Sequence, residues 1–360
     1  MIQTRKDTQT MTAPTAPYGE SPYIHGITGE GGAHLMQDAP GWIVFIHRLG
    51  LDLNQTGGFD GRKWAGQGFG VICRLQHDFS GGGTIPLPSE HARYAQRVAN
   101  FVAASQGCHI WILGNEMNHE QERPVTYPIY PAYYAKLYAM THRLVHALPG
   151  HKDDQIVVGA VAPWNNTTQY FANPSGDWIV YFEQILKEIQ KNHVTPDAIS
   201  IHTYTHGSAP ALITSEARMG APFENRRFHL RTYIDFMEAI PDNLRGLPVY
   251  VTEIDQDVPW LDQANGWSPG AIQEFDRWNQ VPGNQQIRAV IWYRWKGDKW
   301  HMEHKTNLQA DFRRAVDMRC TWRQVASPPA EPPEVPPQQA EIVCTNCGHR
   351  MVLTVGESDG

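Results

Sequence analysis

The sequence predicts an α/β protein whose main domain is a (β/α)8 TIM barrel, because short apolar stretches alternate with segments of helical periodicity along most of the chain. Eight apolar stretches have the length of strands, and the one at 110–113 is apolar at every position. Continuous apolar runs are typical of strands that are buried on both faces, as in a parallel sheet. The predicted strands are, in order, 23–27, 42–46, 70–75, 110–113, 156–161, 198–202, 247–253 and 287–293.

Helical periodicity follows each of the predicted strands from the third to the seventh. Ser89 is expected to cap the first of these helices, and Pro131 is expected in the first turn of the second. No convincing helix follows the first two strands. The glycine-rich segment 29–32 after the first strand predicts a plain loop, since it lacks the Lys-Ser/Thr of a phosphate-binding P-loop. The predicted helices are 89–105, 131–148, 177–190, 223–240 and a segment around 271–279.

The composition fits one large core with a small appendage, and it excludes several classes of partner. The chain has 360 residues, of which 41% are hydrophobic. A formal charge of −7 and the lack of a basic stripe predict no nucleic-acid partner. No apolar run has the length of a membrane span, and no signal peptide is recognisable. We therefore expect no membrane association and a cytoplasmic location, although export by a non-classical route stays open.

Changes in composition divide the chain into four segments. Residues 1–20 are polar and predict a flexible arm, and residues 21–326 contain the barrel. Residues 327–340 are rich in proline and predict an extended, semi-rigid linker. Residues 341–360 predict either a zinc-ribbon-like half motif or a disordered tail.

The tail contains Cys344 and Cys347, a Cys-x-x-Cys pair that resembles one knuckle of a zinc ribbon, with His349 close by. A closed structural zinc site takes four ligands, which is more than this segment supplies. A structural zinc in the tail would therefore require a second copy of the chain or another partner, and zinc binding, if it occurs, is expected to bring self-association. The five cysteines of the whole chain are odd in number and scattered, and they predict no disulfide framework.

Two of the predicted strands end at a glutamate. Asn115 and Glu116 follow the strand at 110–113 after a single glycine, and Glu253 ends the strand at 247–253. In a (β/α)8 barrel the carboxyl ends of the strands form the active face. A pair of carboxyl groups at that face is typical of glycoside hydrolysis, in which the two groups flank the scissile bond.

Together with His202 and Tyr204 near the end of the sixth strand, these residues form an ordered set that resembles the clan A retaining glycoside hydrolases, the cellulase-like barrels. The resemblance implies an enzyme that cleaves a β-glycosidic bond by double displacement, without a cofactor for catalysis, in an oligosaccharide, polysaccharide or simple glycoside. It implies that Glu116 is the acid/base and that Glu253 is the nucleophile. It also implies that Asn115 contacts the sugar 2-hydroxyl, and that Tyr204, in a His-x-Tyr motif with His202, orients the nucleophile.

Three more residues extend the resemblance. Trp295 follows the eighth strand and is implied to be the sugar-platform tryptophan; Trp292 is the second choice, because strand alternation would turn the two to opposite faces. Arg74 is implied to keep the nucleophile ionised. Arg74 lies on the third predicted strand, whereas cellulase-like members usually carry this arginine on the second. Either the strand count is wrong or Arg74 has a structural role.

Other polar and aromatic residues follow the strand ends and are expected at the active face. Trp164 and Asn165 follow the fifth strand and are candidates for substrate binding. His77, His119 and Glu120 are weaker candidates for the same role.

These residues also have simpler interpretations, and two other functions stay open. Glu116 could form a salt bridge with Arg123, and His202 could be a hydrogen-bonded core histidine. The barrel could bind glycans without cleaving them, although the presence of both glutamates argues against this. It could instead be a metal-dependent hydrolase. That class usually has His-x-His in the first strand, where the residue two after His25 is an isoleucine.

Overall fold

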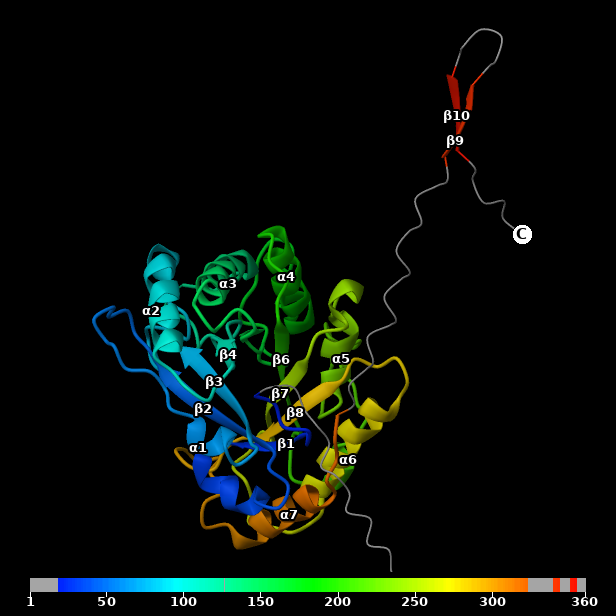
Figure 1. Ribbon diagram of the computed structural model, residues 1–360. Coiled ribbons are helices and arrows are strands. Elements are labelled where there is room, and N and C mark those ends of the chain that lie inside the picture. Colours follow the sequence, from blue (N-terminus) through cyan, green and yellow to red (C-terminus); the bar gives the residue numbers. More distant parts are fainter. Residues whose placement is uncertain (1–18, 126, 323–338, 344–349, 355–360) are drawn as a thin grey trace, which may run out of the picture. The chain divides into compact units, whose positions relative to one another are not determined.

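Eight parallel strands close into a barrel in sequence order, with β8 paired to β1 (Figure 1). This confirms the predicted fold. The computed structural model describes residues 19–125, 127–322, 339–343 and 350–354, and it divides into two units, Met1–Trp322 and Arg323–Gly360, which are described separately. The strands of the barrel are β1 His25–Thr28, β2 Trp42–Arg48, β3 Gly70–Gln76, β4 Ile110–Leu113, β5 Gln155–Val158, β6 Ala198–Tyr204, β7 Val249–Asp255 and β8 Ile287–Trp292.

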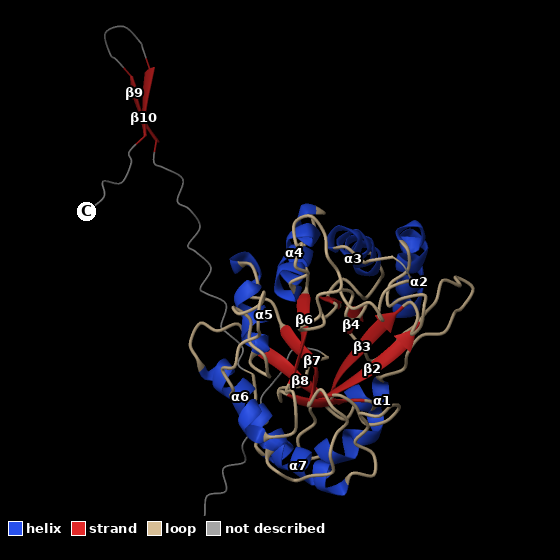
Figure 2. Cartoon of the chain, turned by 180° about the vertical axis from the view of Figure 1, so that it is seen from behind, coloured by secondary structure: helices blue, strands red, loops and turns tan. Residues whose placement is uncertain are grey.

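The helices surround the strands, as the views from the two sides show (Figures 1 and 2). Only short helical turns follow β1 and β2, where the sequence predicts no convincing helix, and longer helices follow β3 to β8. The segment 29–32 is not the plain loop expected, because the 3-10 helix η1 begins at Glu30. The helices are η1 Glu30–Met36, α1 Arg62–Ala65, η2 Pro88–Glu90, α2 His91–Ala103, α3 Pro131–His146, α4 Trp178–Lys191, η3 Pro210–Leu212, α5 Thr232–Ala239, η4 Asp242–Leu244, α6 Trp267–Gln280 and α7 Thr306–Asp317.

The helices differ from the prediction in three ways. Ser89 lies inside η2 and caps nothing, because a 3-10 turn leads directly into α2. The helix expected at 223–240 is limited to α5. The carboxylate of Asp235 accepts a hydrogen bond from the backbone N–H of Arg227 (2.7 Å), which holds the preceding segment in turns. The third difference is α7, which the sequence analysis does not predict.

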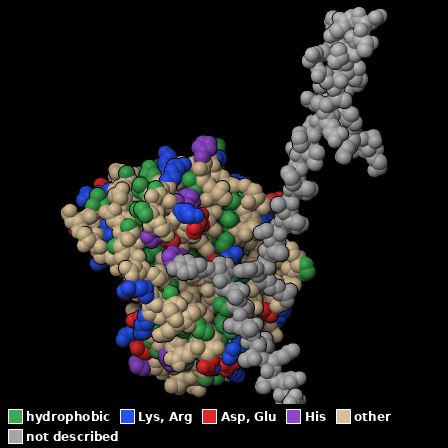
Figure 3. All heavy atoms as spheres, in the orientation of Figure 1, with side chains coloured by type: hydrophobic (Ala, Val, Ile, Leu, Met, Phe, Trp, Pro, Cys, Tyr) green, Lys and Arg blue, Asp and Glu red, His purple; other side chains and the backbone are tan. Residues whose placement is uncertain are grey.

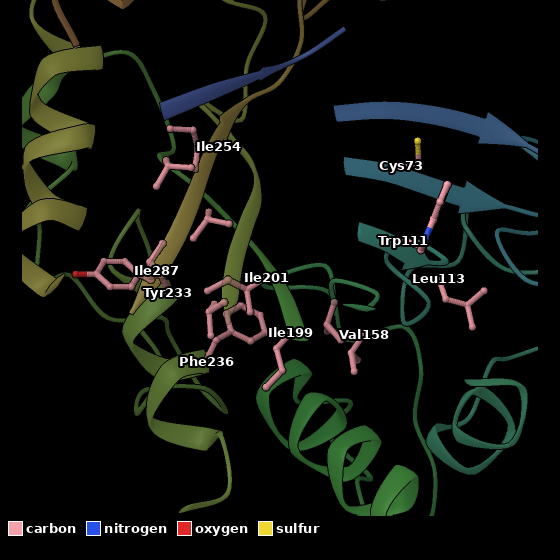
Figure 4. Close-up of a cluster of buried hydrophobic side chains, with 14 of the residues drawn as sticks. Cys73, Trp111, Leu113, Val158, Ile199, Ile201, Tyr233, Phe236, Ile254 and Ile287 are labelled. Atoms are coloured by element: carbon pink, nitrogen blue, oxygen red, sulfur yellow. The ribbon is translucent and has the colours of Figure 1, made fainter. Parts of the chain in front are cut away.

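Apolar side chains fill the barrel on both sides of its strands. One cluster lies in the lumen and includes Trp42, Ile112 and Tyr250. A larger layer lies between the strands and the helices, and Figure 4 shows part of it, including Ile199 of β6 and Phe236 of α5. Successive side chains along a strand alternate between these two layers. Toward the carboxyl ends of several strands, the side chains that face the lumen are polar. These polar side chains therefore meet at the barrel mouth.

The amino ends of the strands are closed by a polar group around Glu20. This residue is only 8% exposed, and its carboxylate forms an ion pair with Arg288 (Nη1–Oε1 2.6 Å) and accepts a hydrogen bond from Gln155 Nε2 (2.8 Å). Tyr250 in turn donates to Gln155 Oε1 (2.7 Å). The assignment of Glu20 to a flexible arm is therefore wrong, because its carboxylate is part of the barrel floor.

The second unit contains a two-stranded antiparallel hairpin of β9 Gln339–Val343 and β10 Arg350–Thr354. Its first strand includes the last two residues of the predicted linker, which is therefore shorter at this end. Cys344, Cys347 and His349 lie outside the described residues, so the zinc site of the tail stays a prediction. The cysteines of the barrel, Cys73, Cys108 and Cys320, are buried and free.

The surface of the barrel carries charges of both signs. Basic and acidic side chains are interspersed on the face shown in Figure 3. In the part of the chain that the structure describes, no helix combines the length and the apolar character that crossing a membrane requires.

Candidate active site

A cavity of about 690 Å³ opens at the carboxyl ends of the strands, which is within the size range of ligand-binding pockets. Strand ends and the loops that follow them supply its walls. The structure therefore brings together residues that are far apart in the sequence. Of the residues singled out from the sequence, those that line the cavity are Arg74, Asn115, Glu116, His119, Trp164, Asn165, Tyr204 and Glu253.

The loop after β4 presents Glu116 through a left-handed backbone conformation. Gly114 and Glu116 have φ angles of 80° and 43°. Glycine adopts a positive φ freely, but this conformation costs a glutamate roughly 1 kcal/mol. The N–H of Glu116 donates to the carbonyl of Ala160 (2.8 Å), and the side chain of Asn118 bonds both the N–H and the carbonyl of Ala162 (2.8 and 2.9 Å). These contacts with the loop after β5 fix the glutamate over the barrel mouth.

A shift in strand register turns Glu253 into the barrel. Tyr250 faces the lumen and Val251 faces the helices, so strict alternation would point Glu253 outward. The pairing of β7 with β6 skips Thr252 and resumes with Glu253 opposite His202. One additional residue in a strand reverses the faces of the side chains that follow it. The irregularity at Thr252 therefore directs the glutamate to the lumen.

The carboxylates of Glu116 and Glu253 lie close together, with two side chains of β6 beside them. Tyr204 Oη lies 3.1 Å from Oε1 of Glu116 and 3.1 Å from Oε2 of Glu253, so it can donate to either. His202 Nδ1 lies 2.8 Å from Oε1 of Glu116, and its Nε2 lies 3.1 Å from the hydroxyl of Thr252. A ring nitrogen of His202 and one oxygen of each glutamate all lie within 4.8 Å of one another.

These contacts determine how the site is protonated. Burial raises the pKa of Glu116, but the hydrogen bond and charge of His202, together with His119 and Tyr204, lower it by more, so this pKa lies below its ordinary value. Burial, and then the negative charges of Glu116 and Glu253, raise the pKa of Tyr204 well above its ordinary value. Tyr204 therefore remains a hydroxyl donor. The contacts of Glu116 favour its ionised form.

Arg74 reaches the site from β3 and forms an ion pair with Glu253, from Nη1 to Oε1. The two side chains are 5% and 8% exposed. The strand count from the sequence is therefore right, and the arginine contacts the glutamate from the third strand. Burial removes the water that would stabilise the charge of the Glu253 carboxylate, and the guanidinium of Arg74 stabilises that charge instead.

Glu116, His202 and Glu253 also form a group whose donor atoms are close enough to hold a metal ion. A cation at this position would compete with the guanidinium of Arg74 for Glu253 and with the hydroxyl of Tyr204 for both glutamates. The donor set thus fits a metal centre less well than it fits a pair of hydrogen-bonded carboxylates.

Three more carboxyl groups line the cavity, and the sequence analysis chose none of them as a site residue: Glu122, Asp255 and Asp257. Burial, and then the negative charge of Glu116, raise the pKa of Glu122 from 4.5 to about 7. Burial also raises the pKa of Asp255 well above its ordinary value. Such shifts are concentrated at functional sites. Asp255 lies two residues after Glu253 on the same strand, so alternation places both side chains on one face, and the sequence could have indicated Asp255. No pattern in the sequence predicts the path of the loop that carries Glu122.

Replacing Glu122 by glutamine is expected to stabilise the protein above pH 7 and to change its stability little near pH 5. The pKa of Glu122 is about 7 in the folded protein, against an ordinary value of 4.5. The folded state therefore binds this proton more tightly than the unfolded state does, and stability falls as the pH rises from about 4.5 through about 7. Glutamine has no charge to bury, so the gain at pH 8 should be on the order of 2 kcal/mol.

Chemical denaturation of the Glu122→Gln variant at pH 5 and pH 8 measures this effect. The control is Glu120→Gln, which alters an exposed glutamate of the same loop. A gain of equal size at both pH values, or in the control, would contradict the assignment of the shift to Glu122.

The region after β8 differs from the sequence prediction. Trp292 is fully buried in the layer between strands and helices, where its Nε1 donates to Ser268 Oγ (3.2 Å), so its assignment as a substrate-binding residue is wrong. The strand ends at Trp292, and alternation therefore does not extend to Trp295. Trp295 lies against the glycine-rich loop after β1, where a Cβ on Gly31 would be 2.1 Å from its Nε1. It does not line the cavity, whereas Tyr293 and Trp300 do.

The other residues expected at the active face divide into two groups. His119, Trp164 and Asn165 line the cavity, but His77 and Glu120 do not. His77 bonds the carbonyl of Gly82 through Nδ1 (3.1 Å). Arg123, considered as a salt-bridge partner of Glu116, donates to Thr167 and Thr168 instead (3.4 and 3.3 Å).

No protein-family model matches the chain, and no curated protein sequence matches it. Solved structures do. The barrel shares its fold with a glucosidase from Croceicoccus marinus. The two chains are 13% identical, with a TM-score of 0.50 over 78% of this chain, and this chain spans 61% of the glucosidase's length.

Two further solved structures match with lower TM-scores. A GH128 endo-β-1,3-glucanase from Amycolatopsis mediterranei has a TM-score of 0.45 and 12% identity, covering 81% of this chain and 99% of its own. A GH39 enzyme from Xanthomonas axonopodis pv. citri has a TM-score of 0.46 and 14% identity, covering 85% of this chain and 66% of its own. At such identities a likeness concerns the fold. The glucosidase thus supports the barrel fold that the sequence predicts.

Proposed function

We propose that this protein is a retaining glycoside hydrolase that cleaves a β-glycosidic bond by double displacement. The observation that carries the proposal is the closeness of the two glutamates at the barrel mouth, with carboxylate oxygens of Glu116 and Glu253 within 4.8 Å of one another. Retaining enzymes place their two carboxyl groups about 5–5.5 Å apart, whereas inverting enzymes need about 6.5–9.5 Å to admit a water molecule.

In this mechanism Glu253 attacks the anomeric carbon. Arg74 binds its Oε1 and Tyr204 donates to its Oε2, so the carboxylate is held in one orientation before the substrate arrives. A nucleophile that is oriented in advance loses little entropy on the way to the transition state.

Glu116 is the acid/base of the proposed reaction. His202 Nδ1 lies 2.8 Å from Glu116 Oε1, so a proton can pass between these two atoms. In the first step Glu116 passes this proton to the leaving oxygen. In the second step the Glu116 carboxylate takes a proton from the water that hydrolyses the glycosyl–enzyme.

The charges of the cavity favour a neutral glycan as the substrate. Five carboxyl groups line the cavity, and burial favours the uncharged form of two of them, Glu122 and Asp255. The two arginines in the lining, Arg74 and Arg294, are already paired with Glu253 and Asp298. The carboxylates that stay charged would repel uronic acids and sulfated sugars. The rings of Phe79, Trp164 and Trp300 are exposed to the cavity and offer surfaces for the apolar faces of sugars.

A panel of neutral and acidic aryl glycosides, each with an α and a β linkage, tests the proposal on the purified protein. We expect hydrolysis of at least one neutral β-glycoside, with the β anomer as the first product seen by NMR spectroscopy. Release of the α anomer from a β-glycoside would contradict the retaining mechanism. Saturable binding of an oligosaccharide without turnover of any substrate would instead indicate a glycan-binding barrel.

A further inference from the structure

Two histidines and an aspartate meet at the end of the barrel opposite the cavity. His142 and His146 are one turn apart on α3, and Asp197 immediately precedes β6. His142 Nε2 lies 3.3 Å from Oδ1 of Asp197, and His146 Nε2 lies 3.2 Å from Oδ2. We infer that these three residues form a binding site for a divalent transition-metal ion of the zinc class, which ties α3 to the start of β6.

The geometry of the group matches a zinc site. Nitrogen and carboxylate ligands lie about 2.0–2.2 Å from zinc, so neighbouring ligand atoms of a tetrahedral site are roughly 3.3–3.6 Å apart. Each histidine nitrogen lies at about that distance from one of the two oxygens of Asp197, and one donor atom from each residue lies within 4.8 Å of the other two. Two imidazoles and a carboxylate are a common ligand set for zinc and its neighbouring metals.

The carboxylate is oriented before any ion binds. The backbone N–H of Ile156 donates to Oδ2 of Asp197 (2.9 Å), and outer contacts of this kind fix metal ligands in place. His146 Nε2 donates a hydrogen bond to the carbonyl of Asp154 (3.0 Å), and a metal ion at this nitrogen would replace that bond. The ring centroids of His142 and His146 are 4.0 Å apart, so two protonated imidazoles would repel each other, whereas a metal ion binds both in their neutral form.

The site is accessible, and the neighbouring carboxylate does not compete for the ion. The side chains of His142, His146 and Asp197 are 15%, 23% and 23% exposed, so an ion can enter without unfolding. The carboxylate of Asp154 already accepts hydrogen bonds from His151 Nδ1 (2.8 Å) and Trp111 Nε1 (2.7 Å). Because the carboxylate of Asp154 is already occupied by these hydrogen bonds, we place the ion at Asp197.

Zinc binding to the full-length chain tests the inference. Cys344 and Cys347 of the tail offer thiolates, so the measurements are made with both replaced by serine. After dialysis against a chelator, titration calorimetry with zinc chloride should give one ion per chain, and saturating zinc should raise Tm by about 3 °C. His142→Ala and His146→Ala should each weaken zinc binding by at least about 100-fold.

A matched control separates this site from the histidines around Asp154. His151→Ala removes a histidine of that neighbouring group and should bind zinc as the parent chain does. Co²⁺ bound in place of zinc should show the visible absorption of a four-coordinate ion. This absorption should be absent from His142→Ala and from His146→Ala. The inference is overturned if zinc neither binds nor shifts Tm, if it binds equally to His142→Ala and His146→Ala, or if His151→Ala is the variant that loses binding.

Discussion

Replacing Glu253 by alanine is expected to abolish the hydrolysis of every glycoside, because the proposed reaction then has no group that can form the glycosyl–enzyme. Glu253→Gln keeps the size of the side chain and an oxygen that can accept from Tyr204, but its amide is not a nucleophile. It should therefore be as inactive as the alanine variant. Steady-state kinetics on an activated aryl β-glycoside, compared with the uncatalysed rate, measures the loss.

Glu116→Ala should behave differently, because it removes proton transfer, a contribution of about 10²–10⁴-fold. An activated aryl leaving group needs little protonation, so the first step should survive. Hydrolysis of the glycosyl–enzyme then lacks its base, and the result should be a burst followed by a slow steady rate. Azide needs no base, and it should speed the second step and yield a β-glycosyl azide.

Two outcomes would change these roles. If neither variant shows a burst, and both lose activity equally on activated and natural substrates, the assignment of nucleophile and acid/base fails. If azide rescues Glu253→Ala to the α-azide and leaves Glu116→Ala unchanged, Glu253 is still the nucleophile, and the acid/base is a residue other than Glu116.

Replacing Arg74 by methionine is expected to cause a large, pH-dependent loss of stability. The ion pair of Arg74 with Glu253 is buried, and removing one partner of such a pair costs about 3–5 kcal/mol. Methionine fills a similar volume without the charge, which leaves Glu253, Glu116, Glu122 and their neighbours with an excess of negative charge. Below about pH 7 the Glu122 carboxyl binds a proton and relieves part of the repulsion. The loss measured by chemical denaturation should thus be larger at pH 8 than at pH 5.

Arg48→Met is the control for this prediction. Arg48 ends the neighbouring strand β2, is 61% exposed and pairs with Asp78 at the surface (3.4 Å), where an ion pair contributes about 0–1 kcal/mol. A loss from Arg74→Met that is no larger than that of the control, or that is the same at both pH values, would show that Arg74 is not the main counter-charge of the cavity.

The barrel could be predicted because each strand is marked by a local apolar run that needs no tertiary information. The strand 110–113 is found with the predicted bounds, and the other seven are found with shifted ends. Helices that depend on long-range contacts were less predictable. The start of α5 is set by the hydrogen bond between Asp235 and Arg227, and no periodicity in the sequence carries that information.

Most of the site residues chosen from the sequence lie together at the cavity, including Trp164 and Asn165 of the loop after β5, whereas Trp292 and Trp295 do not line it. The two glutamates, Arg74 and Tyr204 belong to strand ends or to the residues next to them, and the structure brings them together. Trp295 is the tryptophan that the resemblance implies after the eighth strand, but the strand ends at Trp292 and Trp295 does not line the cavity. Glu122 lies in the loop after β4, whose path is set by contacts with other loops, so the sequence offered no reason to choose it.

The first and last segments of the barrel lie side by side. Tyr23 and Thr321 form an antiparallel bridge, and Trp322 Nε1 donates to the carbonyl of Ser21 (2.7 Å). A short peptide between residues 322 and 19 would therefore close the backbone of this unit into a ring, which could be cut open at a surface turn such as Gly246, where an added Cβ would meet no other atom within 4 Å. A circular permutant of this kind would keep every strand neighbour, although β7 and β8 would become the first strands to leave the ribosome.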